Sequence, residues 1–405
     1  MLRQRTLGKS LVRALHALAI GLALALLFAP ARASAYPWMI RHGYSACAPC
    51  HSDPSGAGPL TEYGRSAGGA VLSMQLDKES DEAPPTAGFL FGLVRPPEWL
   101  ALGGDGREAL LRVKVPGTAM IRETILMKAD LEASITTGRF LASATGGYAH
   151  EGALGAAVTR GSTDNFVSRQ HWLGYYVNED STLLLRAGRM NLPFGIRSIE
   201  HTLWVRALTQ TDINDKQQYG AAFAWSAGPL RGELMAIAGN LQLRPDIYRE
   251  RGYSTYLEAV LGRSLVLGAS SLITHRELDP SSFKETWRQA HGAYVRYATP
   301  WEPLVVLSEW DYTLTSARGQ LRSKGVAGYA QVDFEAAQGV HFLVTGEAQD
   351  VGVNRPPWSW GTWLSYAWFL LPHTDVRLDG IYQSLGSQYG RVPVYSLLLQ
   401  GHVYL

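Results

Sequence analysis

The sequence predicts an all-β chain, a transmembrane antiparallel β-barrel of about sixteen strands with a short N-terminal segment of different character. Three observations favour this fold. Charged residues make up only 18% of the chain, below the ~25% that is usual for soluble domains. Gly (42), Tyr (19) and Trp (12) are abundant. After the N-terminus, no stretch has the ~18 apolar residues of a transmembrane helix, yet long segments alternate between apolar and polar residues.

The first 35 residues predict a secretory signal peptide. Basic residues precede an apolar run from Ala14 to Ala29, and Ala33-Ser34-Ala35 is a small-residue cleavage site, so the mature chain would begin at Tyr36. An uncleaved membrane anchor is the alternative, but the apolar run is short for a membrane span. We therefore expect an exported protein.

The two cysteines of the chain lie in the sequence Cys47-Ala48-Pro49-Cys50-His51. This is the spacing of c-type haem attachment, in which both thiols bind the haem covalently and the histidine coordinates the iron. We expect one haem c, attached by Cys47 and Cys50, with His51 as the proximal axial ligand. The alternatives are a disulfide, a thiol-redox pair, or a zinc site that would need two more ligands nearby. Export and spacing favour haem.

The sixth iron ligand is left open by the sequence. His42 is the first candidate and Met39 the alternative, because one turn before the cysteines could position either. Met74 lies downstream, and His341 and His402 are predicted to face the lumen of the barrel. A histidine would lower the reduction potential of the haem, and a methionine would raise it.

Four regions follow from these patterns: a signal peptide (1–35), a haem module (36–76), a linker (77–97) and a transmembrane β-barrel (98–405). A module of ~40 residues cannot bury enough apolar surface to fold alone, so we expect the barrel to shelter it in or at the lumen. The linker combines acidic and basic residues with Pro84-Pro85 and Pro96-Pro97.

From about residue 98 onward, apolar residues alternate with polar ones, as in Phe342 and Val344 against His341 and Thr345. In a barrel, the apolar positions face lipid and the polar positions face the lumen, where charges are most simply explained as polar filling and cross-strand pairs. Longer loops are expected near 151–167, 191–216, 241–252 and 277–287. The last run, ending at Leu405, would close the barrel on the first strand. The expected strand centres are near residues 105, 127, 145, 173, 186, 222, 235, 258, 270, 294, 308, 330, 345, 365, 379 and 398.

Two stretches resemble known families. The run from Arg186 to Gly195 resembles a strand and turn of bacterial porins, including phosphate-selective porin-like proteins. Arg41, the Cys47–His51 motif, Leu60 and Tyr63-Gly64-Arg65 resemble the opening of the fused monohaem cytochrome–porins of the outer membrane, known from iron-oxidising bacteria. The resemblance implies haem attachment at the two cysteines, ligation by the histidine, and a haem at or in the barrel.

This chain departs from that family after the motif. A loop from Asp53 to Pro59 replaces a stretch containing Phe-Pro, and Arg65 is not followed by Phe-Lys. The resemblance therefore implies the architecture, while ferrous iron as the electron donor is not implied.

The predicted function is electron transfer between an extracellular donor or acceptor and periplasmic carriers, from a position in the bacterial outer membrane. We expect an electron-transfer protein rather than a classical enzyme, with extracellular metal oxidation as a reaction it could support. One haem cannot cover a ~30 Å hydrocarbon core, so a periplasmic c-type cytochrome or other electron carrier is an expected partner, beside outer-membrane lipid and an extracellular redox substrate.

Two other functions compete with this one. One is a diffusion porin whose haem-bearing segment is a plug or a sensor, and the other is a soluble β-sandwich cytochrome. A formal net charge of +2 without a long basic run argues against nucleic acid as a partner. No catalytic triad, paired-carboxylate spacing or phosphate-binding glycine motif rises above chance.

Overall fold

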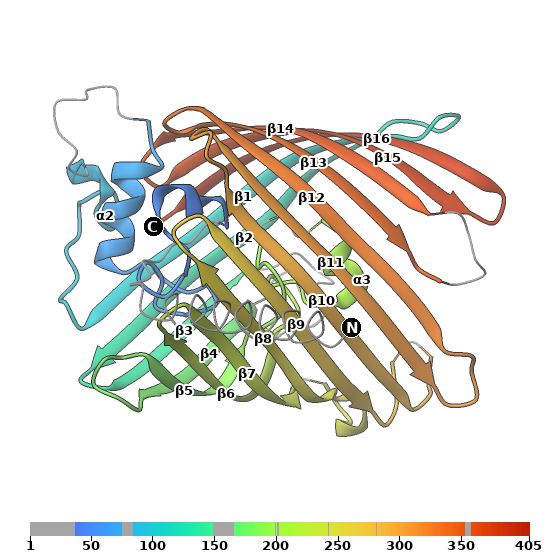
Figure 1. Ribbon diagram of the computed structural model, residues 1–405, viewed down its shortest axis with the longest axis horizontal. Helices are drawn as coiled ribbons and strands as arrows, with labels where there is room; N and C mark the ends of the chain where they lie inside the picture. Colours follow the sequence, from blue (N-terminus) through green and yellow to red (C-terminus); the bar gives the residue numbers. More distant parts are fainter. Residues whose placement is uncertain are drawn as a thin grey trace, which may run out of the picture.

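A computed structural model describes residues 37–74, 84–148, 166–198, 200, 202–241, 243–280, 282–352 and 358–405. Within these residues, sixteen antiparallel strands form one closed barrel, in which successive strands pair and β1 pairs with β16 (Figure 1). The strands are β1 (Leu100–Lys114), β2 (Ile121–Thr137), β3 (Phe140–Tyr148), β4 (Phe166–Tyr176), β5 (Leu183–Met190), β6 (Gln218–Ala227), β7 (Leu230–Gly239), β8 (Arg251–Leu261), β9 (Leu265–Arg276), β10 (Thr286–Ala298), β11 (Leu304–Ala317), β12 (Ser323–Ala337), β13 (Val340–Asp350), β14 (Ser359–Leu371), β15 (Thr374–Ser387) and β16 (Gly390–Tyr404).

The predicted barrel is confirmed, and each of the predicted strand centres lies within its strand. The alternation has the predicted orientation. On β13, Phe342 and Val344 are 48% and 50% exposed, whereas His341 and Thr345 are buried. On β15, Leu378 is exposed in the same way. An apolar exterior around a polar interior is the reverse of a soluble protein and suits a wall in contact with lipid.

The helical elements are short: η1 (Pro37–His42), α2 (Glu62–Val71), η2 (Pro85–Ala87), α3 (Trp204–Thr209) and η3 (Asp246–Tyr248). No helix in the described part of the chain is long and apolar enough to cross a membrane. The predicted signal peptide, the start of the predicted linker and most of the loop predicted near 151–167 lie outside the described residues.

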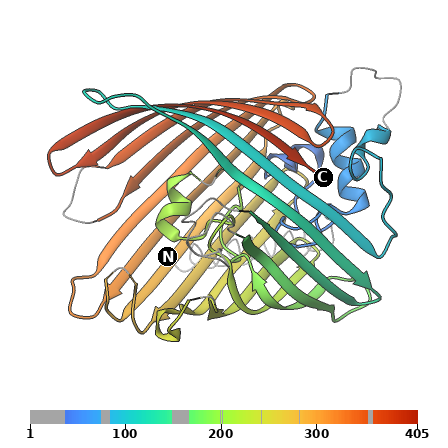
Figure 2. The same cartoon turned by 180° about the vertical axis from the view of Figure 1, so that it is seen from behind.

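The long connection between β5 and β6 folds into the barrel, which the sequence predicted only as a loop. Both views place α3 within the outline of the barrel (Figures 1 and 2), and α3 contacts β11, β12 and β13. The Arg206 side chain is buried and donates hydrogen bonds of 3.3 and 2.9 Å to the Glu309 carboxylate on β11. Phe194 is fully buried. This connection therefore fills part of the lumen.

The N-terminal segment packs at one end of the barrel, beside the last residues of the chain (Figure 1). Here η1 contacts β10 and β11, and the backbone N–H of Met74 donates to the Phe369 carbonyl of β14 over 2.9 Å. Its apolar side chains join one buried cluster with the β5–β6 connection and the strands. That cluster includes Trp38, Met39, Ile40, Leu72, Ile196, Leu203, Trp204, Val205, Val266, Leu307 and Leu343.

Candidate cofactor site

The cysteine motif forms a tight turn that is joined directly to α2. The backbone N–H groups of Cys50 and His51 both donate to the Cys47 carbonyl, over 3.1 and 3.0 Å. Thr61, the residue before α2, donates from its backbone N–H to the Cys50 carbonyl over 2.9 Å, and from its hydroxyl to the Pro49 carbonyl over 2.7 Å. The same hydroxyl caps the helix. Helix and motif therefore form one unit.

The Tyr63-Gly64-Arg65 sequence has a structural reason at each position. A Cβ atom on Gly64 would lie 2.2 Å from the Cys50 carbonyl oxygen, so only glycine allows α2 to approach the motif this closely. The Tyr63 hydroxyl donates to the Tyr44 hydroxyl over 3.2 Å. The Arg65 guanidinium donates to a carbonyl of β1, which connects the helix to the barrel wall.

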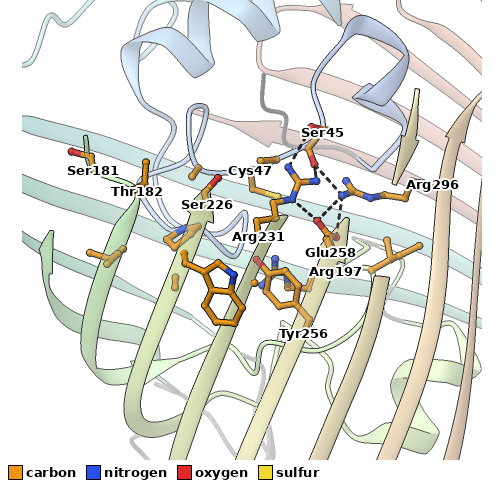
Figure 3. Close-up of a pocket in the computed structure, with 18 of the residues that line it drawn as sticks. Ser45, Cys47, Ser181, Thr182, Arg197, Ser226, Arg231, Tyr256, Glu258 and Arg296 are labelled. Carbon is orange, nitrogen blue, oxygen red and sulfur yellow. Dashed lines mark hydrogen bonds and ion pairs between the residues drawn. The ribbon is translucent and has the colours of Figure 1, made fainter. Parts of the chain in front are cut away.

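Two arginines of the wall hold the peptide just before the first cysteine (Figure 3). Arg231 on β7 and Arg296 on β10 both donate to the Ser45 carbonyl, the latter over 2.9 Å. Both guanidinium groups also pair with the Glu258 carboxylate on β8, and all three charged side chains are at most 9% exposed. Buried charges of this kind are stable only when paired and hydrogen-bonded, so the Ser45 carbonyl is an integral part of the cluster.

A third arginine holds the chain just after the motif. Arg186 on β5 donates to the Asp53 carboxylate over 2.7 Å and also pairs with Glu233 on β7. All three side chains are at most 1% exposed. Asp53 in turn accepts a hydrogen bond of 2.7 Å from the backbone N–H of Ser55. The motif is thus fixed to the wall on both sides.

A partly open pocket lies between the motif, α2 and the wall of the barrel. Its lining combines Cys50 and His51 with apolar or small residues of the N-terminal segment, and with polar residues of β1, β2 and β16. The lining includes Met39, Leu60, Ala67, Leu72, Glu132 and His402. An apolar chamber with a few polar groups at one edge suits a large, mostly apolar cofactor.

The chemistry of His51 and Cys50 fits haem better than the alternatives. Burial lowers the pKa of His51 to about 4, against a hydrogen bond with the Gly58 backbone, so the imidazole is in the neutral form that binds metals. Its Nδ1 atom is buried and has no hydrogen-bond partner among the described residues. Burial, with a smaller effect of Cys47, raises the pKa of Cys50 to about 11, whereas a redox-active thiol needs a lowered pKa.

The other two alternatives find no support in the described part of the chain. There, both cysteines are free, and no group of three His, Cys, Asp or Glu residues could hold a metal ion such as zinc. Cys50 and His51 line the pocket beside α2, whereas Cys47 lines the neighbouring one with Arg231 and Glu258. The residues present fit a covalently attached haem, with Cys47 and Cys50 as attachment points and His51 as a ligand. The haem itself stays a prediction.

The candidates for the sixth ligand differ in whether they line the pocket that contains His51. Met39 and His402 line the same pocket as His51. His42 is not among the described lining residues, and its Nε2 atom lies 3.1 Å from the Glu335 carboxylate on β12. His42 stays a prediction, but it would have to leave this partner to reach the pocket.

The two remaining candidates contact other groups. The His341 ring packs on Trp38, with 4.3 Å between the ring centroids, and its Nδ1 atom lies 3.1 Å from the Asp333 carboxylate. The Met74 sulfur accepts a hydrogen bond from the Trp368 indole over 2.6 Å. Both side chains are therefore part of the packing between the N-terminal segment and the wall.

Charges elsewhere in the lumen pair with one another, as the sequence favoured, though not always across strands. Lys128 on β2 lies 2.7 Å from Asp105 on β1. The Arg377 guanidinium donates over 2.8 Å to Asp379 on the same strand, β15, and also pairs with Glu200 in the β5–β6 connection. These pairs satisfy polar side chains in the interior without requiring a conduction path.

The residues that hold the motif in place were missed by the sequence reasoning. Arg231, Glu258 and Arg296 carry one available signal, because each is a charged residue at an inward position of an alternating strand. That signal predicts a lumen-facing charge, but not its partner. Their partner Ser45 lies far away in the sequence, as Asp53 does from its partner Arg186.

Solved structures similar to this chain are outer-membrane proteins. An anion-selective porin from Comamonas acidovorans is 10% identical, with a TM-score of 0.56 over 76% of this chain and 99% of the porin. The chain has a porin-like outer-membrane barrel fold. The outer membrane channel DcaP of Acinetobacter baumannii matches this porin-like barrel with a TM-score of 0.54 and 10% identity, over 76% of this chain and 97% of the channel. OmpT of Vibrio cholerae matches with a TM-score of 0.56 and 9% identity, over 76% and 97%.

These likenesses concern the porin-like fold alone, because the identities are so low. No protein-family model matches the sequence, and no curated protein matches it. The predicted resemblance to porins is confirmed at the level of the barrel, and the single closed barrel excludes the soluble β-sandwich. None of the comparisons bears on haem or electron transfer.

Proposed function

We propose that this protein is an outer-membrane, porin-like barrel whose N-terminal segment carries a haem c, and that the haem exchanges electrons between a periplasmic carrier and an extracellular donor or acceptor. One observation carries the proposal. The cysteine motif is held against the inner wall of the barrel by buried arginines on both sides, at Ser45 and Asp53. The porin-like fold and the apolar exterior support an outer-membrane location.

Each part of the site has a distinct role in this proposal. Cys47 and Cys50 would attach the haem and His51 would bind its iron, which supplies one-electron exchange between the ferric and ferrous states. The apolar face of α2 limits water in the pocket and so helps to set the reduction potential. A single site cannot cover a ~30 Å hydrocarbon core, so a periplasmic c-type cytochrome or similar carrier completes the path.

A second candidate function is a diffusion porin in which the haem-bearing segment is a plug or a sensor. The comparisons favour it more directly, because the similar structures include an anion-selective porin and an outer membrane channel. The interior of this barrel favours the first candidate, because the N-terminal segment and the β5–β6 connection share a buried apolar cluster with the inner wall.

One set of measurements separates the two. The protein is produced in an export- and haem-maturation-competent host, extracted from outer membranes and assayed for covalent haem, with the Cys47→Ser/Cys50→Ser variant as the control. It is then placed in liposomes with a membrane-impermeant reductant outside and a soluble c-type cytochrome inside, and in planar bilayers for conductance.

Each outcome has one meaning. Low conductance together with reduction of the internal cytochrome by the external reductant supports electron transfer. High conductance with a haem that neither reductant nor cytochrome reaches supports the porin. A mature chain without covalent haem would refute the electron-transfer function and the haem-bearing plug or sensor, and would leave a porin without a cofactor.

A further inference from the structure

We propose that His402, on the last strand of the barrel, is the second axial ligand of the iron that His51 binds. The inference rests on the proposed haem and deepens it, because it identifies the group on the other face of the iron. It also predicts that the ligand comes from the wall of the barrel instead of from the N-terminal segment.

The first argument is placement. His402 lies on β16 opposite Arg107 of β1, and its side chain points into the lumen, only 5% exposed. It lines the same pocket as Cys50 and His51. Among the histidines weighed as sixth ligands, His42 and His341 are not part of the described lining.

The second argument is the hydrogen bonding of the ring. His402 Nδ1 lies 2.7 Å from the Asp375 carboxylate on β15 and 3.3 Å from a guanidinium nitrogen of Arg107, and Nε2 lies 3.1 Å from the Asp105 carboxylate on β1. An imidazole that donates one N–H to a carboxylate while its other nitrogen binds a metal is the recurrent arrangement of metal-ligating histidines. The Asp375 contact provides that orientation.

The third argument is the low cost of the change. Binding iron through Nε2 would replace one contact, that with Asp105. The Asp105 carboxylate would not be left unpaired, because Lys128 lies 2.7 Å from it. The pair with Asp375 would stay in place. The polar network can therefore release Nε2 without exposing a buried, uncompensated charge.

Met39 is the competing group in the pocket, and packing accounts for its position. Its side chain is 2% exposed and belongs to the apolar cluster with Trp38, Ile40 and Leu72. Methionine commonly fills irregular gaps in such cores. The His402 ring lies beside that of Tyr404, with 5.1 Å between the ring centroids, but its two nitrogens face polar groups at the edge of the pocket instead of an apolar core.

The test uses the haem-loaded, full-length protein in detergent, and records ferric optical and electron paramagnetic resonance spectra with a redox titration. We expect a low-spin, six-coordinate spectrum for the unchanged protein. His402→Gly should convert it to a high-spin spectrum, and added imidazole should restore the low-spin form. Asp375→Asn removes the negative charge that makes the ring a stronger electron donor, so it should raise the reduction potential while the low-spin form is retained.

Met39→Leu and His42→Gln are the matched controls, and both should keep the low-spin spectrum. A low-spin spectrum in folded His402→Gly, or its loss in Met39→Leu, would overturn the inference. So would a high-spin spectrum of the unchanged protein. Folding is checked for each variant by heat-modifiable mobility. If His402→Gly does not fold, His402→Met takes its place, which should keep the low-spin form and raise the reduction potential; an unchanged potential would overturn the inference. Absence of covalent haem from the unchanged protein is a separate result, which refutes the proposed function itself.

Discussion

Replacing Arg186 by alanine should release the N-terminal segment from the barrel. The change leaves the Asp53 and Glu233 carboxylates without their main partner, in a site where both side chains are at most 1% exposed. Removing one partner of a buried ion pair costs about 3–5 kcal/mol. Asp53 can escape this cost by moving into water with its segment, whereas Glu233 is part of the wall and keeps a second arginine, Arg197, 3.8 Å away.

The expected effect is therefore on docking of the segment more than on the barrel. At ~1.4 kcal/mol per tenfold change, the population of the undocked segment should rise between about a hundredfold and a few thousandfold. The assay is limited proteolysis of the folded protein, in which the cleavage rate between residues 37 and 74 reports the undocked population when opening and closing are fast. Heat-modifiable mobility on gels checks that the barrel itself stays folded.

Two further variants sharpen the interpretation. Arg139→Ala removes an ion pair with Glu179, which is 90% exposed, and should leave the cleavage rate unchanged because such pairs contribute at most about 1 kcal/mol. Arg186→Met combined with Asp53→Asn removes both charges of the docking pair and should recover part of the protection. An unchanged cleavage rate in Arg186→Ala would show that this buried pair does not hold the segment.

Three other predictions concern the motif and the wall. Gly64→Ala should lower the yield of haem-loaded protein on a haem-stained gel, because the new Cβ would lie 2.2 Å from the Cys50 carbonyl oxygen. Gly346→Ala on β13, where an added Cβ has no atom within 4 Å, should not lower it, and equal yields would contradict the close approach. In haem-free protein, docking of the segment should weaken as the pH falls from about 6.5 towards about 4. In this range His51 binds a proton when the segment is undocked but not when it is docked, because burial lowers the pKa of the docked His51 to about 4. Protease protection measured against pH checks this prediction, and the pH dependence should disappear in His51→Gln. Leu364→Arg changes a 64% exposed side chain on β14 and should lower the free energy of unfolding in lipid vesicles by about 2–4 kcal/mol. Leu321→Arg changes a 97% exposed side chain in the turn before β12 and should alter that free energy little; equal effects would argue against lipid contact at β14.

The barrel could be predicted from the sequence because its signal is local. Each strand shows its own period of two, and the exposed Val344 beside the buried Thr345 follows directly from that pattern. The inward fold of the β5–β6 connection could not be predicted in this way. Its apolar residues, such as Trp204 and Val205, occur in a stretch where apolar and polar residues do not alternate over a long run. The surface on which they pack exists only when the barrel wall has formed.

The candidate site likewise combines a local motif that the sequence predicts with long-range contacts that it does not predict. Cys47, Cys50 and His51 form a contiguous motif whose chemistry depends on spacing alone. The contacts that position it join residues 133 positions apart for Asp53 with Arg186, and 251 apart for Ser45 with Arg296. No local pattern specifies such partners. The same holds for His402, whose position in the pocket depends on the closure of the barrel.

That closure also constrains the order of assembly. β16 meets β1 in antiparallel register, and the Leu405 and Gly104 backbones exchange hydrogen bonds of 2.8 and 3.3 Å. Gly103 at this seam is so close to Pro59 that an added Cβ would lie 2.9 Å from its ring. Contacts between such distant parts of a chain form late in folding. We therefore expect the seam to be the last part to join, so that the strands wrap around a segment that is already in place. A group bound at Cys50 is then most easily attached before the first and last strands meet.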